Sequence, residues 1–240
     1  MRYREVFLLI LLFFLSTNLL FAQKDTTISF ARQNKKARYY SFSAGMGLNY
    51  CDNKSLKTFV EYELPFYNNV PANQRLATYY TGIEFFGGAE FQISKKLAIK
   101  GEYSYFSKSY NSTFSVDYAN REFTYYNHQP FLTLYYLIPQ QNSFIKIGAG
   151  GGYLFSNLTK RIYGAESNYY STGLAFRLSG VLDIQMGKSL AGYVSVFANK
   201  TFQSDLKDRN GNLLRNSNNE TVNLNSFGVG VRLGIEFFIF

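Results

Sequence analysis

The chain has 240 residues, enough for one domain or two small ones, with 21 Tyr, 24 Phe, 19 Gly, no Trp and a formal net charge of +9. Such a high content of aromatic residues favours strands over helices and predicts an all-β protein. The single Cys51 excludes an intrachain disulfide, and the single His128 excludes a metal site built from several histidines.

The N-terminus has the three parts of a secretory signal peptide. A basic start precedes an apolar run over residues 6–15, and the small Ala22 supplies a cleavage position. A retained membrane anchor is the alternative, but residues 16–18 interrupt the run before it reaches the roughly 20 residues of a spanning helix. We therefore predict a helical, cleaved signal peptide over residues 1–22 and a periplasmic lead-in over residues 23–37.

The positive charge of the chain persists after cleavage. The signal peptide contains two arginines and one glutamate, so its removal lowers the formal net charge from +9 to +8. An excess of this size is typical of proteins that contact nucleic acids or acidic surfaces. Export to the cell envelope argues against a nucleic acid, so we expect no nucleic-acid partner.

From about residue 38 onward, apolar residues alternate with small or polar ones at a period of two, which indicates strands with one apolar face. Two runs, at about 123–138 and 190–199, are apolar in both registers, so the sequence does not show which residues of these runs face inward and which face outward. Six runs have a clear register, at residues 41–49, 82–93, 97–105, 145–155, 172–186 and 226–239. We expect eight strands in total.

The connections between these runs alternate in length. Long polar stretches at about 51–78, 107–122, 156–168 and 200–222 are separated by short turns at 94–96, 139–143 and 187–189. Outer-membrane barrels have this asymmetry, with short periplasmic turns and long outer loops. Tilted strands of about nine to eleven residues cross the hydrocarbon, and an even number closes without a free edge. We therefore predict an antiparallel up-and-down transmembrane β-barrel over residues 38–240, with eight strands, or ten if residues 51–78 contain a hairpin.

The charged residues of the six clear strands all fall on the small or polar face. A membrane barrel requires this, because an outward Arg or Lys costs ~2–4 kcal/mol at the bilayer midplane. We therefore predict a lumen network of ion pairs formed by Glu84, Glu90, Lys100, Glu102, Lys146, Arg177, Asp183, Arg232 and Glu236. An ion pathway or a catalytic site in the lumen is the alternative. Because side chains fill the interior of an eight-stranded barrel, we do not expect a general diffusion pore.

The signal peptide, the eight alternating runs and the ending Glu236-Phe237-Phe238-Ile239-Phe240 resemble outer-membrane β-barrel proteins of the OmpA-like and OmpX-like kind, over about residues 38–240. The loop composition is similar to that of Bacteroidota envelope proteins. The resemblance implies a place in the bacterial outer membrane, surrounded by its lipid. It also implies that Phe237, Phe238 and Phe240 form a C-terminal signal for the barrel-assembly machinery.

No set of residues in the sequence indicates catalysis or cofactor binding. We expect a structural or interaction role through the long outer loops, toward an unknown extracellular or envelope partner, with no enzyme activity, cofactor or metal. One alternative is a lipid-modifying barrel enzyme in which His128 activates a nearby Ser or Thr, although its neighbours lack the His-x-Ser arrangement of barrel lipid A deacylases. Another is a soluble secreted barrel that binds a small apolar ligand, which would need the apolar face inward.

Overall fold

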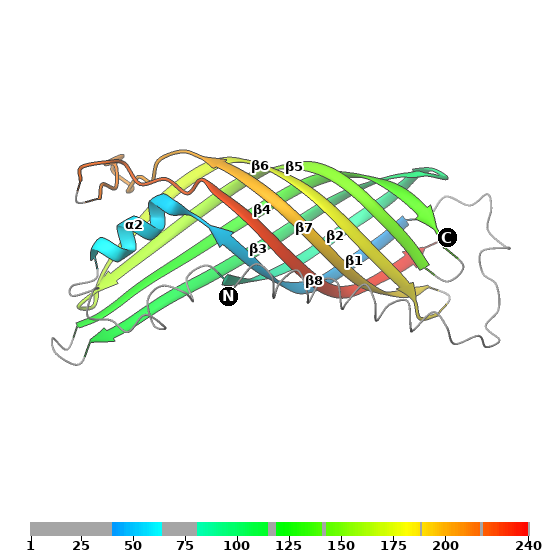
Figure 1. Ribbon diagram of the computed structural model, residues 1–240, viewed down its shortest axis with the longest axis horizontal. Coiled ribbons are helices and arrows are strands. Elements are labelled where there is room, and N and C mark those ends of the chain that lie inside the picture. The colour runs from blue at the N-terminus through cyan, green and yellow to red at the C-terminus, as the bar shows by residue number, and fades with distance from the viewer. Residues whose placement is uncertain are drawn as a thin grey trace, which may run out of the picture.

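The computed structural model describes residues 40–63, 81–114, 119–140, 143–187, 189–216 and 218–239. Eight antiparallel strands pair in chain order, and β8 pairs with β1, so the predicted up-and-down barrel is confirmed (Figure 1). The strands are β1 (Tyr40–Asp52), β2 (Thr81–Ser94), β3 (Leu97–Phe114), β4 (Ala119–Pro139), β5 (Ser143–Ile162), β6 (Ala165–Gln185), β7 (Leu190–Gln203) and β8 (Ser226–Ile239). The predicted signal peptide and lead-in lie outside the described residues.

The alternation of side chains along each strand separates a lumen from an outer surface. In β1, Ser41 and Ser43 are buried, whereas Phe42 between them is exposed. The two runs whose faces the sequence did not assign, now in β4 and β7, follow the same rule: over residues 126–138 and 190–203 the even-numbered residues point outward and the odd-numbered residues inward. Their inward positions carry rings such as Tyr135 and Tyr193, which explains why neither face is polar in the sequence.

The outer surface is apolar on every strand. Leu132 of β4, Leu178 of β6 and Leu233 of β8 are 57%, 66% and 58% exposed, and apolar residues continue the same outward rows. Proteins surrounded by water seldom expose apolar patches of more than a few hundred Å², so this surface is built to face lipid. The alternative of a secreted barrel with its apolar face inward is therefore wrong.

Short turns join the strands at one end of the barrel, as predicted. The connections from β2 to β3, from β4 to β5 and from β6 to β7 each contain four residues or fewer. We call this the turn end. In an outer-membrane barrel it faces the periplasm.

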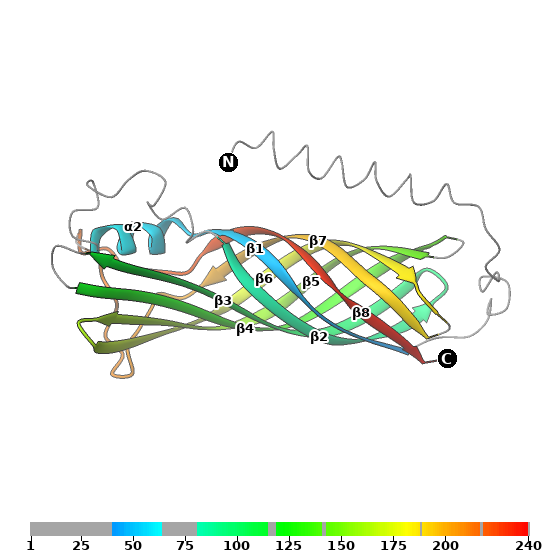
Figure 2. The same cartoon turned by 90° about the horizontal axis from the view of Figure 1, so that it is seen from below.

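At the opposite end, which we call the loop end, two of the predicted long loops are largely strand. Residues 156–162 and 165–168 continue β5 and β6, and Tyr163 and Gly164 join them. Both turn residues have positive φ, 51° and 81°, as in a type I′ turn, whose twist matches the flanking strands. β3 and β4 likewise extend over most of residues 107–122. The strands β3 to β6 therefore project beyond the other four (Figure 2).

The other two connections at the loop end have folded structure of their own. Helix α2 (Lys54–Glu63) occupies the first part of residues 51–78, where a hairpin would have made ten strands. Asn53 caps the helix, because the Leu56 amide donates a hydrogen bond to Asn53 Oδ1 at 2.8 Å. Isolated β-bridges order the described residues between β7 and β8. No helix in the described part of the chain is long and apolar enough to cross a membrane.

Candidate functional site

The structure places all nine charged residues of the predicted network inside the barrel, each at most 7% exposed. Their strands are β2 (Glu84, Glu90), β3 (Lys100, Glu102), β5 (Lys146), β6 (Arg177, Asp183) and β8 (Arg232, Glu236). Contacts between them define two groups. We call them the arginine cluster, built on Arg177 and Arg232, and the lysine cluster, built on Lys146.

In the arginine cluster, two guanidinium groups share two carboxylates. Arg232 donates to Glu84 through Nε at 3.1 Å and Nη2 at 2.6 Å, and to Glu102 through Nη1 at 2.7 Å. Arg177 Nη1 donates to the same Glu102 oxygen at 2.9 Å. The centroid of the Phe197 ring lies 4.8 Å from Arg177 Cζ and 4.6 Å from Arg232 Cζ. Two-point hydrogen bonds and ring contacts offset part of the cost of removing these charges from water.

In the lysine cluster, one ammonium group meets three carboxylates. Lys146 Nζ lies 2.8 Å from Glu90 and 2.7 Å from Asp183. It lies 3.0 Å from Glu236, which also accepts a hydrogen bond from the Ser41 hydroxyl. Lys146 is therefore the common cation of three buried acids, one from β2, one from β6 and one from β8.

Lys100 lies beside the arginine cluster. Its Nζ is 3.1 Å from Glu102 and donates to the Tyr193 hydroxyl at 3.4 Å. Among the described residues and with Lys100 included, the arginine cluster has three bases and two acids, a formal charge of +1, whereas the lysine cluster has one base and three acids, a formal charge of −2. The two clusters therefore attract each other within the lumen, where charges are little screened.

Glycines on the inward face leave room for the side chains that cross the lumen. A Cβ added at Gly47 would lie 2.7 Å from Arg232 Cγ, and one added at Gly45 would lie 2.8 Å from the Phe86 ring. Both distances are too short for real contacts. The glycine content noted in the sequence thus has a packing reason, since a larger residue would displace the groups that hold the network.

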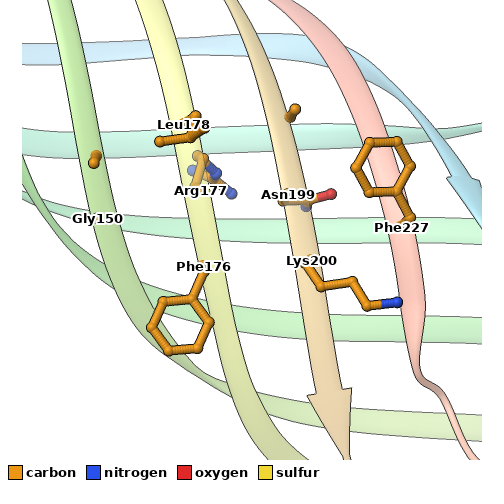
Figure 3. A pocket seen from close by; sticks show the side chains of 9 residues that line it. Gly150, Phe176, Arg177, Leu178, Asn199, Lys200 and Phe227 are labelled. Carbon is orange, nitrogen blue, oxygen red and sulfur yellow. The ribbon is translucent and has the colours of Figure 1, made fainter.

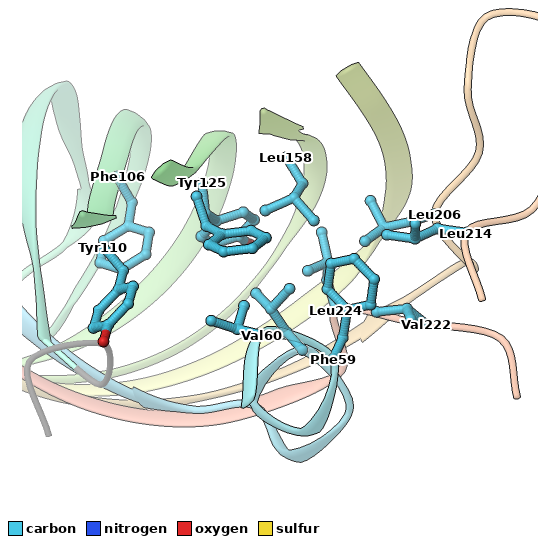
Figure 4. Close-up of a cluster of buried hydrophobic side chains, with 12 residues drawn as sticks. Phe59, Val60, Phe106, Tyr110, Tyr125, Leu158, Leu206, Leu214, Val222 and Leu224 are labelled. Carbon is cyan, nitrogen blue, oxygen red and sulfur yellow. The ribbon is translucent and has the colours of Figure 1, made fainter. Parts of the chain in front are cut away.

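An apolar core lies at the loop end of the barrel. It consists of Leu56, Phe59 and Val60 of α2 together with Phe106, Tyr110, Phe123, Tyr125, Leu158, Leu206, Leu214, Val222 and Leu224 (Figure 4). We call this set the loop-end core. It joins the helix, the segment between β7 and β8, and the projecting wall of β3 to β5. This core was not predicted from the sequence, although the spacing of Leu56, Phe59 and Val60 at i, i+3 and i+4 is the signal of an amphipathic helix.

A polar layer lines the lumen next to the loop-end core. The Tyr125 hydroxyl accepts hydrogen bonds from Asn127 Nδ2 at 3.1 Å and from Gln203 Nε2 at 3.4 Å. Ser156 donates to Gln203 Oε1 at 2.6 Å. Lys108 is also buried, with its Nζ 5.4 Å from the centroid of the Tyr125 ring. Lys108 was not predicted to face the lumen because it falls within residues 107–122, a stretch expected to form a loop, where a lysine normally faces water.

His128 lies on the outward face of β4. Its Nδ1 is hydrogen bonded to the Tyr103 hydroxyl at 2.5 Å, and its ring lies 5.1 Å from the ring of Tyr105, centroid to centroid. Within the described ranges, His128 has no hydrogen bond to a Ser or Thr hydroxyl. The structure thus brings His128 together with two tyrosines, an arrangement typical of the aromatic girdle at a membrane surface.

The C-terminal residues singled out in the sequence divide between the two faces of β8. Phe237 points outward and is 50% exposed, whereas Phe238 is buried and packs against Ala191. Ile239 points outward, in the register expected from its odd number. Phe240 lies outside the described residues. Among the described residues, no group of three or more His, Cys, Asp or Glu side chains could hold a metal ion.

No protein-family model matches the chain, and no curated protein matches it. Among solved structures, a major outer membrane protein from Thermus thermophilus aligns with a TM-score of 0.51 at 10% identity, over 83% of this chain and 99% of that chain. Ail, the attachment invasion locus protein of Yersinia pestis, aligns with a TM-score of 0.47 at 13% identity, over 84% and 98%. The first likeness shows the fold, and together with the lipid-facing outer surface it identifies the chain as an eight-stranded β-barrel of the bacterial outer membrane.

Proposed function

We propose that the protein is a closed outer-membrane barrel that acts through the folded surface at its loop end, in a structural or interaction role. The loop-end core carries this proposal, since Leu56, Val60 and Leu224 are completely buried there. Loops that merely border a pore need no core of their own. A surface held by a core is already ordered, so a partner can bind it at a smaller entropic cost.

The filled lumen supports a role other than general diffusion. The loop-end core, the polar layer, the arginine cluster and the lysine cluster are all built from inward side chains of the barrel wall, α2 and the segment before β8. An eight-stranded barrel has little interior space beyond what such side chains occupy. The charges of the lumen therefore act mainly on one another.

A role other than catalysis is supported by the position of His128. The lipid-modifying alternative needs a nearby Ser or Thr that the imidazole can activate. In the described part of the chain the hydrogen-bond partner of His128 is Tyr103, and both lie on the outer face. The enzyme alternative predicts a lipid-modifying activity that a His128→Ala variant would lose.

The partners that we propose follow from the two surfaces of the barrel. Outer-membrane lipid surrounds the apolar outer surface, and an extracellular or envelope partner meets the loop end. The barrel-assembly machinery would act earlier, by recognising the outward Phe237 and its C-terminal neighbours.

Two measurements on the full-length protein test the proposal. In proteoliposomes, a swelling assay with arabinose should give a rate no higher than that of empty liposomes. In intact cells, a photo-crosslinking amino acid at Tyr163, which is 66% exposed at the tip of the β5–β6 hairpin, should give discrete protein adducts. The same group at the lipid-facing Leu178, also 66% exposed, is the matched control and should not. Rapid swelling, or equal adducts at both positions, would contradict the proposal.

A further inference from the structure

A lysine stands on the lipid-facing surface of β7. Lys200 is exposed and points outward, in the same row as Val196 and Ala198. Its neighbours in the adjoining strands are Phe176 of β6 and Phe227 of β8, two further apolar residues. A cation in such a row is costly unless it reaches the headgroup region or a partner.

The position of Lys200 along the barrel places its charge near the membrane surface. β7 ends three residues later, at Gln203, and β8 begins one residue before Phe227. Lys200 therefore lies near the loop end of the apolar surface, where a flexible lysine side chain can extend to outer-leaflet headgroups. Its Nζ lies 5.7 Å from the centroid of the Phe202 ring, and no carboxylate of the described residues forms an ion pair with it.

An apolar groove lies beside this lysine on the outer surface. The groove has a volume of about 270 Å³. Ala149, Gly150 and Ala198 contribute small residues to it, and Phe176, Leu178 and Phe227 contribute large ones. Figure 3 shows Lys200 on β7 between Phe176 on β6 and Phe227 on β8, with its side chain extending toward β8. The groove thus arises where short side chains of β5 and β7 lie among the larger side chains of β6 and β8.

We propose that this groove is a binding site for a phosphate-bearing anionic lipid of the outer leaflet. An acyl chain would lie in the groove, because its lining is apolar and it opens on the lipid-facing surface. The lipid phosphate would meet the ammonium group of Lys200, which lacks a carboxylate partner among the described residues. Charge complementarity therefore selects an anionic lipid over a zwitterionic one. The proposal is independent of the role assigned to the loop end.

Native mass spectrometry of the full-length barrel in a neutral detergent tests the site. Phosphatidylglycerol and phosphatidylcholine with identical acyl chains are added separately, and the fraction of protein that retains a lipid is measured. We expect the wild type to retain phosphatidylglycerol about fivefold better than phosphatidylcholine. This ratio corresponds to the ~1 kcal/mol that one lysine contributes at an anionic lipid surface. A gel shift between unheated and boiled samples verifies that each variant is folded.

Three variants separate the headgroup contact from the groove. Lys200→Gln should abolish the preference for phosphatidylglycerol, and Ala198→Leu, which fills the groove, should lower retention of both lipids. Lys207→Gln makes the same change of charge at an exposed position in the segment before β8 and should leave the preference intact. The proposal is overturned if Lys200→Gln keeps the preference, if both lysine variants lose it equally, or if Ala198→Leu changes nothing.

Discussion

Replacing Lys146 with methionine removes the cation on which the lysine cluster is built while keeping most of the side-chain length. Three carboxylates lie within 3.0 Å of Lys146 Nζ, and all three side chains are at most 3% exposed. The variant leaves these acids facing one another in a site that water barely reaches. Breaking a buried ion pair by removing one partner costs about 3–5 kcal/mol, so we expect a loss of at least about 3 kcal/mol in the free energy of unfolding at neutral pH.

Urea unfolding of the barrel in phospholipid vesicles measures this loss, with the unboiled gel shift reporting the folded fraction. Lys95→Met, in the exposed turn between β2 and β3, is the matched control and should change stability by no more than about 0.5 kcal/mol. Adding Asp183→Asn to the Lys146 variant should restore part of the stability, because one of the unpaired charges disappears. A loss of less than about 1 kcal/mol for Lys146→Met would refute the view that this lysine holds the cluster together.

Three further predictions concern the loop end. Phe59→Ala opens a cavity in the loop-end core, so it should lower the stability of the loop end by about 3–5 kcal/mol. We expect faster proteolysis of α2 with an unchanged gel shift of the barrel. Unchanged proteolysis would contradict the role of the loop-end core in holding α2. Gly164→Val places a branched side chain at a φ of 81° and should lower the stability of the β5–β6 turn by about 1–2 kcal/mol. Amide hydrogen exchange at the β5–β6 tip should become faster, and exchange at the wild-type rate would contradict this prediction. Hydrogen bonds from the Asn212 side chain and amide lower the pKa of Asp208, so the stability that Asp208 gives its turn is present above its ordinary pKa and is lost as the pH falls through the lowered value. An NMR titration of the Gly211 amide follows this loss, and a transition at or above the ordinary value would contradict it.

The barrel could be predicted from the sequence because lipid imposes a strict alternation on its strands. In β8, Val229, Val231 and Leu233 point outward and Arg232 points inward, as their period of two requires. The faces of β4 could not be assigned from the sequence because its lumen side also carries aromatic residues such as Phe131. The centroid of the Phe131 ring lies 4.1 Å from Arg177 Cζ. An inward ring that packs on a guanidinium group cannot be distinguished from a lipid-facing ring in one sequence.

The loop end could not be predicted to the same extent, since its polar segments carry several kinds of structure. Beyond the membrane the outward residues of β5 and β6 are polar, so these strands lack the alternation of apolar and polar residues that would have predicted their continuation. Only Gly164 indicated the turn between them. Lys108 and Lys200 both lie in stretches assigned to loops, yet one is buried in the lumen and the other is on the lipid-facing wall. Whether each lysine faces the lumen, the lipid or water depends on how far the neighbouring strands extend. The residues around each lysine do not indicate this length.

The central claim, a closed barrel embedded in the outer membrane, is tested most directly by extracting purified outer membranes with alkaline carbonate and comparing unboiled and boiled protein on a detergent gel. We predict that the protein stays with the membrane pellet and migrates differently before and after boiling. Release into the carbonate supernatant with identical migration in both samples would contradict the claim.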